Sequence, residues 1–430
     1  MSKILLISHI FPPAIDGGSR VIYKLGQQLK ARGHTTLYLS SNRSSTDDFV
    51  KLKYQKSKTL TSNQIKLPVY TFLRKPLKLL EIICIRFLFI NPKSYFINLI
   101  KVLQKGPIFK LFPFLKATIK IIKFKPDIIV AGPLPTTIVL YASFFKIIIN
   151  KINFPLSSKG NAPQWRGRGF CKVLINSSFH PTDPDFQLLP LIHSLQKADY
   201  LWTLTQFETN YFINNFKINP DKIILAGNGV DSDFLIKKTK IKKSTIYNRR
   251  SKILFIGSLS SHKRVELLLN SFSTIYHLRS NISLTIAGQK TLYYPKIKET
   301  FDSLEPKIKS RIKFIFDFPQ NKLVQLIDNC AFLVLPSIQE SFGLVIIESW
   351  ARGKPVIVSD IPSLSELINQ SQGGLIFKQD NQIDLQNQMK KLIDSPQSCY
   401  QYGQNGLKYV KTNYLWKKVS QKICQKLKLS

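Results

Sequence analysis

The chain has few of the residues that build metal sites and disulfide frameworks. None of its five cysteines has C-x-x-C spacing, and they stand at positions 84, 171, 330, 399 and 424. Scattered cysteines of this kind indicate neither a zinc site nor a set of disulfides. A reducing cytoplasm is therefore the simplest compartment.

Acidic residues are also scarce. The 430 residues include 25 Asp and Glu against 63 Lys and Arg, which gives a formal net charge of +38. The excess is uneven, because residues 1–125 carry 23 basic and only 4 acidic side chains. Such a charge predicts an anionic partner, which is a phospholipid surface, a nucleic acid or a nucleotide-bearing substrate.

Long unbroken apolar runs are missing as well. The N-terminal run Ile4–Ile7 is too short for a signal peptide. The longest uncharged stretch, Ile128–Phe145, has 18 residues, about the length that a membrane span needs. Gly132, Pro133 and Pro135 interrupt it, so we expect a short strand, a turn and a helix in a soluble core.

What the sequence does contain is a regular alternation of strand-like and helical patterns. A chain of this length with 44% hydrophobic residues is expected to form two or three domains with large cores. Strands that alternate with helices predict parallel sheets built from βαβ units. The predicted strands form two sets: Ile4–Ile7, Thr36–Leu39, Asp127–Val130, Lys172–Ile175, Tyr200–Thr203 and Lys222–Leu225, then Ile253–Ile256, Ser283–Ile286, Lys313–Ile315, Phe332–Leu335 and Val356–Val358.

A basic segment separates the two sets. Residues 237–252 include eight basic residues, no acidic residue and little apolar pattern. We interpret this segment as a linker between an N-terminal domain at 1–236 and a C-terminal domain at 253–410. A last helix, in residues 411–430, is expected to pack back towards the first domain.

Two carboxylates in the second set have a distinctive spacing. Glu340 and Glu348 are separated by seven residues, and buried strands are predicted on both sides of them. A helix is expected over Phe342–Arg352, with Gly353 at its C-terminal cap. Glu340 would then lie in the strand-to-helix loop and Glu348 two turns inside the helix. Ligands of open α/β sheets bind at such strand ends, where a helix N-terminus attracts phosphate.

This run and its flanks, Pro336-Ser337 and Ala351–Asp360, resemble the E-x7-E motif of retaining GT-B glycosyltransferases of family four. The resemblance implies an α/β protein of two Rossmann-like, doubly wound parallel-sheet domains that face one another across a cleft. The C-terminal domain would bind a nucleoside-diphosphate sugar donor and the N-terminal domain an acceptor. Without this context, Glu340 would only end a strand and Glu348 would be a solvated helix residue.

The resemblance assigns further donor-binding residues. After the strand Ile253–Ile256 the family has Gly-Arg shortly followed by Lys, two cations that neutralise the donor diphosphate; here the sequence reads Gly257-Ser258 and then Lys263. Ser258 thus replaces the arginine, and Arg264 is the candidate to compensate. Other donor contacts are implied at Gly17, Gly18, Gly288, Phe318, Phe342, Gly343, Leu344 and Glu348.

The catalytic role of Glu340, Lys263 and a histidine is also implied by the resemblance. Glu340 would hold the hydroxyls of the transferred sugar, Glu348 the ribose, and Lys263 the leaving diphosphate. Related sequences place a histidine near the transferred sugar, which here is His180, with His9 as the rival. A lone histidine is otherwise more often a satisfied structural residue.

A basic and apolar segment precedes the third predicted strand. Residues 71–125 carry 12 Lys or Arg and one acidic residue, Glu81, among Leu, Ile and Phe. Basic and apolar residues at helical spacing suit an interfacial helix on an anionic membrane, although a helix docked on the first domain has the same pattern. We expect peripheral contact with the inner face of the cell membrane.

With this resemblance, we expect a metal-independent, retaining glycosyltransferase that uses a nucleoside-diphosphate sugar and needs no cofactor. It would serve cell-envelope or exopolysaccharide synthesis with a glycan, lipid-linked or other acceptor. Two alternatives remain open. A GT-B-fold nucleotide-sugar epimerase would need acid/base carboxylates in the first domain, where Asp16, Asp183 and Asp185 are the candidates. A non-catalytic membrane or nucleic-acid binding protein would account for the charge, but readers of single-stranded nucleic acid show exposed aromatics in a basic groove, so nucleic acid is unlikely to be the partner.

Overall fold

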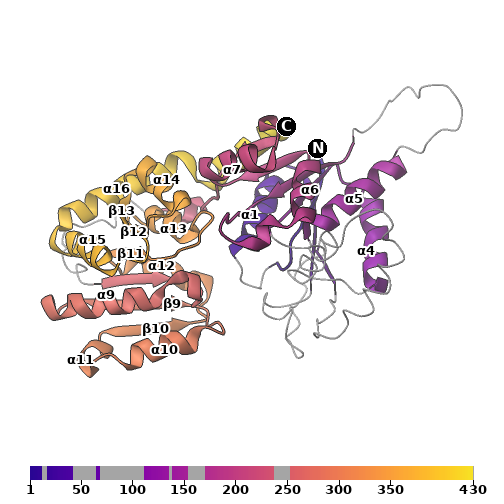
Figure 1. Cartoon of the computed structure of the whole chain (residues 1–430). Coiled ribbons are helices and arrows are strands. Elements are labelled where there is room, and N and C mark those ends of the chain that lie inside the picture. The colour runs from indigo at the N-terminus through magenta and orange to yellow at the C-terminus, as the bar shows by residue number, and fades with distance from the viewer. Residues whose placement is uncertain are drawn as a thin grey trace, which may run out of the picture. The chain divides into compact units, whose positions relative to one another are not determined.

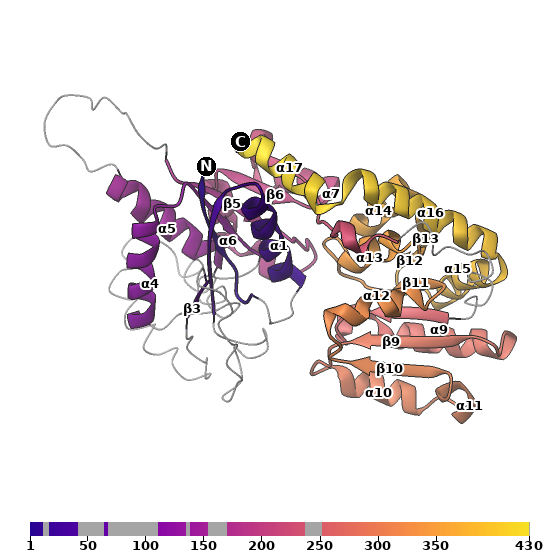
Figure 2. The same cartoon turned by 180° about the vertical axis from the view of Figure 1, so that it is seen from behind.

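The computed structural model describes residues 1–11, 17–41, 64–67, 111–134, 138–153, 170–236 and 252–429. The described chain forms two compact units, one of residues 1–226 with 420–430 and one of residues 227–419 (Figures 1 and 2). Predictions for Asp16, Cys84, the linker at 237–251 and the part of the basic segment before residue 111 lie outside the described residues.

The first unit contains a seven-stranded parallel sheet in the order β3-β2-β1-β4-β5-β6-β7. Its strands are β1 (Lys3–Ile7), β2 (Thr35–Ser41), β3 (Gln64–Leu67), β4 (Ile128–Ala131), β5 (Lys172–Asn176), β6 (Tyr200–Thr203) and β7 (Ile223–Leu225). Its helices are α1 (Gly17–Ala31), α4 (Leu111–Phe124), α5 (Ile138–Asn153), α6 (Leu189–Lys197) and α7 (Gln206–Phe216).

The central strands of this sheet are apolar throughout because helices cover both faces. All four residues of β4 are buried, and β1 pairs with β2 on one side and with β4 on the other. The strand order reverses between β1 and β4, so the loops after these two strands diverge at a topological switch point. The predicted division of residues 128–145 is confirmed, because β4, a turn at Gly132-Pro133 and the first half of α5 occupy it.

The second unit contains a six-stranded parallel sheet in the order β10-β9-β8-β11-β12-β13. Its strands are β8 (Lys252–Ile256), β9 (Ser283–Gly288), β10 (Ile312–Phe316), β11 (Phe332–Leu335), β12 (Val356–Ser359) and β13 (Gly374–Phe377). Its helices are α9 (Val265–Leu278), α10 (Tyr294–Asp302), α11 (Pro306–Lys309), α12 (Gln320–Asp328), α13 (Leu344–Ala351), α14 (Pro362–Ser371), α15 (Gln382–Asp394), α16 (Pro396–Asn413) and the start of α17 (Trp416–Leu427).

Two helix layers enclose this second sheet. Helix α9 contacts α10 and α15, whereas α16 contacts α13 and α14. The strand order reverses between β8 and β11, which defines the switch point of this unit. The predicted α/β fold of two doubly wound parallel sheets is confirmed, and the cleft expected between the domains stays a prediction.

All eleven predicted strands are present with small shifts at their ends. The sequence reading missed two, β3 and β13, and each is the outermost strand of its sheet. An edge strand has a neighbour on one side only and needs less apolar surface, so its sequence carries a weaker pattern. In β13, for example, Leu375 and Ile376 are only partly buried.

The C-terminal segment crosses back over residues 227–236. The backbone N–H of Val230 donates to the carbonyl of Tyr414 at 2.8 Å, and Trp416 donates to Val230 at 3.0 Å. Residues 420–430 then group with the first unit, where the hydroxyl of Ser420 accepts from the Arg32 guanidinium at 3.4 Å. Residues 227–236, in contrast, group with the second unit.

The carboxyl ends of β8 and β9 approach one another very closely. A Cβ atom added to Gly288 would lie 1.7 Å from the carbonyl oxygen of Gly257, which is backbone and cannot swing away. A Cβ atom added to Gly257 would lie 3.2 Å from the buried Phe255 ring, a contact that a shift of a few tenths of an ångström relieves. Glycine is therefore required at position 288 far more than at position 257.

We expect Gly288→Ala to destabilise the second unit by about 3 kcal/mol, at the upper end of the cost of overpacking, because the two strands must separate. The matched control Gly257→Ala should cost about 1 kcal/mol or less. Scanning calorimetry of both variants measures the difference. Equal unfolding temperatures would show that the two strand ends separate without cost.

Candidate functional site

Several of the predicted donor-binding residues of the second unit lie at its switch point. The loop after β8 holds Gly257, Ser258 and Lys263, and the loop after β11 holds Glu340 and leads into α13. Because β8 and β11 are neighbouring parallel strands, both loops emerge at the same edge of the sheet. Residues almost eighty positions apart in sequence are thereby brought together.

The ammonium group of Lys263 forms an ion pair with Oε1 of Glu340. Each of the two side chains is only 13% exposed. The hydroxyl of Ser337 also donates to this carboxylate, at 3.2 Å. A cation and a carboxylate that are held side by side and largely shielded from water present a polar surface for a ligand that is both anionic and hydroxylated.

Backbone contacts fix the two loops relative to each other. The N–H of Ile338 donates to the carbonyl of His262 at 2.8 Å. The hydroxyl of Ser363, in the first turn of α14, donates to the Glu340 carbonyl, and Ser359 donates to Ser337. The Lys263–Glu340 pair is thus anchored from β8, β11 and β12 together, which lowers the entropy cost of binding a ligand there.

The N-terminus of α13 adjoins this pair. Gly343 is the N-cap residue and has φ of 72°, a left-handed conformation that favours glycine. The ring of Phe342 is buried and packs edge-on against Tyr414, with ring centroids 5.1 Å apart. The first N–H groups of an α-helix lack a hydrogen-bond partner within the helix. The backbone N–H groups of Phe342, Gly343 and Leu344 can therefore be offered to a ligand.

Glu348 lies in the second turn of α13 and is 7% exposed. The predicted helix between the two apolar strands is confirmed, and Gly353 ends it with φ of 67°, as a C-terminal glycine cap does. Glu348 is not a solvated surface residue. A carboxylate this deep in an apolar helix needs hydrogen-bonding partners to be tolerated.

Ser258, which replaces the family's arginine, and Arg264, the candidate to compensate for it, each contact another side chain. Ser258 shares a hydrogen bond of 3.1 Å with Ser260. Arg264 has a left-handed backbone, with φ of 51°, and its guanidinium makes two contacts with Asp380, of 2.9 and 3.1 Å. An anion that recruits Arg264 must therefore compete with Asp380 for it.

Gly288 is the last residue of β9, and Phe318 follows the neighbouring strand β10. The sequence reading missed Lys290, whose ammonium lies 4.2 Å from the ring centroid of Phe316 and 4.7 Å from that of Tyr294. A lysine over two aromatic rings gains cation–π attraction. The proximity of the β9 and β10 ends brings Phe316 to Lys290, whereas Tyr294 is only four residues from Lys290 in the sequence.

Gly17 and Gly18 begin helix α1 at the switch point of the first unit. A Cβ atom added to Gly18 would lie 2.5 Å from Cγ of Pro133, so Gly18 permits close packing of α1 on the turn after β4. The adjoining hydroxyls of Ser8 and Ser19 are 2.8 Å apart, and Ser19 also contacts His9 at 3.3 Å. His9 is buried in this polar cluster.

His180 follows β5 in the first unit. Its ring packs edge-on against Phe186, with centroids 5.5 Å apart, and its carbonyl accepts from the N–H of Asp183 at 3.2 Å. His180 is half-buried. Of the acidic residues that an epimerase would require, Asp183 stands in this turn, three residues from His180.

The sequence reading also missed Glu208, in the first turn of α7. This carboxyl group is 2% exposed, and burial raises its pKa to about 7 against hydrogen bonds that lower it. Thr205 caps α7 by accepting from the Glu208 N–H at 3.1 Å, so the sequence Thr205-Gln206-Phe207-Glu208 has the spacing of a capping box. This capping-box spacing is the sequence pattern that could have identified Glu208.

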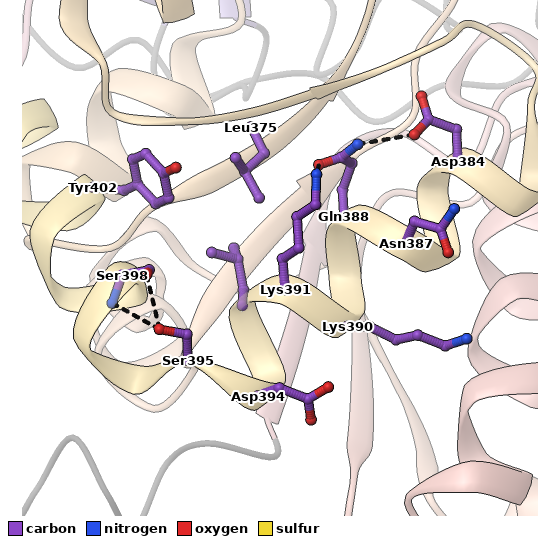
Figure 3. A pocket seen from close by; sticks show the side chains of 11 residues that line it. Leu375, Asp384, Asn387, Gln388, Lys390, Lys391, Asp394, Ser395, Ser398 and Tyr402 are labelled. Atoms are coloured by element: carbon purple, nitrogen blue, oxygen red, sulfur yellow. Dashed lines mark hydrogen bonds between the residues drawn. The ribbon is translucent and has the colours of Figure 1, made fainter.

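A hollow of about 690 Å³ lies beside β13, between α15 and α16 (Figure 3). None of the predicted site residues lines it. The Gln388 side chain donates a hydrogen bond to Asp384 at 2.8 Å and accepts one from Lys391 at 3.1 Å. The hydroxyls of Ser395 and Ser398 are 2.8 Å apart. These polar groups bind one another, as those at the switch point do.

Two further features bear on cofactors and membranes. Within the described ranges, no three His, Cys, Asp or Glu side chains are grouped so that they could hold a metal ion. No helix of the described part of the chain combines the length and the apolar character that a membrane crossing requires.

Known glycosyltransferases resemble this chain in sequence. Residues 236–409 match the family described as glycosyl transferases group 1. An uncharacterised glycosyltransferase of Methanocaldococcus jannaschii is 26% identical over 54% of the chain and 66% of its own length. The O-antigen chain mannosyltransferase RfbU of Salmonella typhimurium is 25% identical over 50% of the chain and 57% of its own length. These matches thus span between about half and two thirds of the curated relatives.

Solved structures share the fold over the whole chain. Sucrose-phosphate synthase of Thermosynechococcus elongatus has a TM-score of 0.69 at 16% identity and covers 100% of this chain and 98% of its own. HepE of Anabaena, solved with UDP and glucose, has a TM-score of 0.66 at 14% identity and covers 100% of both chains. The two doubly wound sheets and these neighbours show that the chain has the GT-B fold. Residues 236–409, which lie in its second unit, match the glycosyl transferases group 1 family.

Proposed function

We propose that this protein is a retaining glycosyltransferase that moves a sugar from a nucleoside-diphosphate sugar to a glycan or lipid-linked acceptor. The observation that carries the proposal is the shielded Lys263–Glu340 pair at the switch point of the second unit, beside the N-terminus of α13. A diphosphate needs a cation and N–H donors, and a sugar needs a carboxylate for its hydroxyls. These requirements meet at one edge of this sheet.

The leaving diphosphate is stabilised as the glycosidic bond to it breaks. In the proposed reaction Lys263 and the backbone N–H groups at the start of α13 bind the negative charge that develops on the diphosphate. The acceptor hydroxyl attacks the anomeric carbon from the same face, and a diphosphate oxygen takes its proton. The bond to the acceptor forms where the bond to the diphosphate breaks, so the configuration is retained.

The two glutamates orient the donor in this proposal. Glu340 accepts hydrogen bonds from hydroxyls of the transferred sugar, which places the anomeric carbon beside Lys263. Glu348 accepts from the ribose hydroxyls. His180 hydrogen-bonds the transferred sugar from the first unit. No metal ion takes part in these steps.

The relatives favour this class of chemistry. RfbU is an O-antigen chain mannosyltransferase, and a relative from Corynebacterium diphtheriae, 22% identical over 53% of the chain, is a D-inositol 3-phosphate glycosyltransferase. HepE was solved with UDP and glucose. We therefore propose a role in cell-envelope or exopolysaccharide synthesis, with uridine-diphosphate sugars as the first donors to test.

The decisive experiment is acceptor-dependent release of nucleoside diphosphate. A thermal-shift screen of nucleotide sugars selects the donor, and the chosen donor is then incubated with and without membrane glycolipid or oligosaccharide acceptors. Diphosphate release that requires the acceptor supports the transferase. Formation of an isomerised nucleotide sugar without acceptor would instead identify an epimerase, and binding without any turnover would identify a non-catalytic protein.

Glu348→Gln should weaken donor binding about tenfold to a hundredfold, because a charge-assisted hydrogen bond to the ribose contributes about 1.5–3 kcal/mol. Isothermal titration with the selected donor measures the change. Glu299→Gln, at an exposed position on α10, is the matched control and should leave the affinity unchanged. An unaltered dissociation constant for Glu348→Gln would remove this residue from the donor site.

Lys263→Ala should lower kcat about tenfold to a hundredfold, because the charge on the leaving diphosphate loses a charged donor, worth about 1.5–3 kcal/mol. Lys296→Ala, which removes an exposed lysine that pairs with Glu299, is the control. Turnover per folded molecule is compared after calorimetry. If both variants kept kcat within a factor of about two, Lys263 would be a structural partner of Glu340 only.

We also propose that the first unit docks on the anionic inner face of the cell membrane. Helices α4 and α5 lie side by side in both views of the molecule and contact each other (Figures 1 and 2). On α4 the large apolar side chains Phe112, Leu115 and Ile119 are 78%, 49% and 55% exposed, although Ala117 and Ile121 already pack inward. Exposed apolar residues at this spacing form a stripe along one helix face.

Basic residues accompany this stripe. Lys116, Lys120 and Lys123 are exposed on α4, which has no acidic residue, and Phe144 and Ile147 extend the apolar surface onto α5. An anionic lipid surface matches this chemistry, because head groups pair with lysines while apolar side chains enter the acyl boundary. Such docking would bring the enzyme to a lipid-linked acceptor.

Vesicle co-sedimentation tests the docking. Binding to phosphatidylglycerol vesicles and not to phosphatidylcholine vesicles is expected, with a loss in high salt because the screening length falls from about 10 Å at 0.1 M to about 3 Å at 1 M. Changing Lys116, Lys120 and Lys123 together to Glu should abolish binding. The same change at the exposed lysines Lys307, Lys322 and Lys408 of the second unit alters net charge equally and should reduce binding far less.

A protein that stays in the supernatant with anionic vesicles at low salt would contradict the membrane proposal and favour a soluble anionic acceptor.

A further inference from the structure

The buried carboxyl group of Glu208 joins the ends of two neighbouring strands. Oε1 accepts a hydrogen bond from the N–H of Phe179, after β5, at 2.9 Å, and Oε2 accepts from the N–H of Leu204, after β6, at 2.5 Å. Glu208 itself stands on a third element, helix α7. One side chain therefore ties together the loops after β5 and β6 and the start of α7.

This arrangement goes beyond helix capping. In a capping box the glutamate side chain returns to the N-cap residue of its own helix, which here is Thr205. Glu208 also reaches Phe179, 29 positions earlier in the sequence. Capping alone does not require this long-range contact.

The carboxyl group is held by dipoles and not by charges. The hydroxyl of Ser177 and the N–H groups of Phe179, Leu204 and Thr205 act on it, and among the described residues no charged side chain contributes to its pKa, which burial raises to about 7. Burying a carboxyl group without a counter-charge is costly. An apolar residue would fill this place at lower cost if packing were the only requirement.

The segment that Glu208 holds is the one that presents His180. Ser177 donates to the Trp202 carbonyl at 2.9 Å, Ser178 has a left-handed backbone with φ of 43°, and the Phe179 ring packs against Phe212 at 4.9 Å. His180 follows directly. Its backbone position is therefore set by the N–H and the ring of Phe179, and the N–H is held by Glu208.

We propose that Glu208 is a positioning residue that fixes the loop after β5 so that His180 meets the transferred sugar. The inference rests on the proposed function, in which His180 binds that sugar. Glu208 accepts a hydrogen bond from the N–H of Phe179. Its effect on the reaction passes through the next residue, His180.

Glu208→Gln is the most informative variant. The amide keeps the volume of the side chain, but it presents an NH₂ group to one of the two backbone N–H donors, so one loop is released. We expect kcat to fall at least tenfold while the KM for the donor stays within about threefold, because the donor diphosphate and ribose bind to the second unit. Glu208→Asp, which is too short to span both donors, serves as the second variant if Glu208→Gln does not fold.

A double-mutant cycle with His180→Ala separates positioning from stability. If Glu208 acts through His180, Glu208→Gln should lower kcat less than twofold in the His180→Ala background. Leu195→Ala, a cavity variant in the core of the first unit, is the control that lowers unfolding temperature without changing kcat per folded molecule. Hydrogen exchange of a peptide covering residues 177–181 should accelerate in Glu208→Gln and not in Leu195→Ala.

The outcomes distinguish the two proposals. If His180→Ala lowers kcat and the effect of Glu208→Gln simply multiplies with it, Glu208 is structural and the positioning proposal is overturned. The same holds if exchange over residues 177–181 is unchanged. If His180→Ala retains the kcat of the unaltered protein, the role of His180 in the proposed function fails, and the positioning of His180 by Glu208 fails with it.

Discussion

The reversal of strand order between β8 and β11 is the constraint on which the candidate site depends. Because the two strands are parallel neighbours whose following helices turn to opposite sides, their loops separate and leave the edge of the sheet accessible. Lys263 and Glu340 come from these two loops, and their ion pair exists only because the sheet places the loop ends together. The first unit has the same reversal of strand order between β1 and β4, where Gly18, Ser8 and Ser19 lie.

The same constraint explains how much the sequence could predict. The buried strands around Glu340 and Glu348 are continuous apolar runs, so their type, order and intervening helix follow from the pattern. Loop positions relative to strands follow too, and the carboxyl ends of parallel strands share one edge of the sheet. The outer strands β3 and β13 escaped because an edge strand needs less apolar surface. Long-range polar contacts such as that of Glu208 with Phe179 leave no pattern in local sequence.

The contacts of Arg264 could not be predicted from its residue type and its position in the sequence. Its position in the sequence suits a substitute for the arginine that Ser258 replaces, yet its left-handed backbone directs the guanidinium to two contacts with Asp380. Both side chains are more than one third exposed, so water and salt screen this pair, although its two contacts have the stronger bidentate geometry. A diphosphate, with its higher charge, can compete with Asp380 for the guanidinium.

The site therefore has two kinds of positive charge for a diphosphate, one fixed and one exchangeable. Lys263 is shielded and anchored by Glu340, while Arg264 is exposed and paired with Asp380. The backbone N–H groups at the start of α13 add a third contribution that costs no side-chain entropy and that no single substitution removes. If the site binds a diphosphate as proposed, the helix terminus and Lys263 hold it while Arg264 exchanges partners, and the loss of the usual arginine is tolerated.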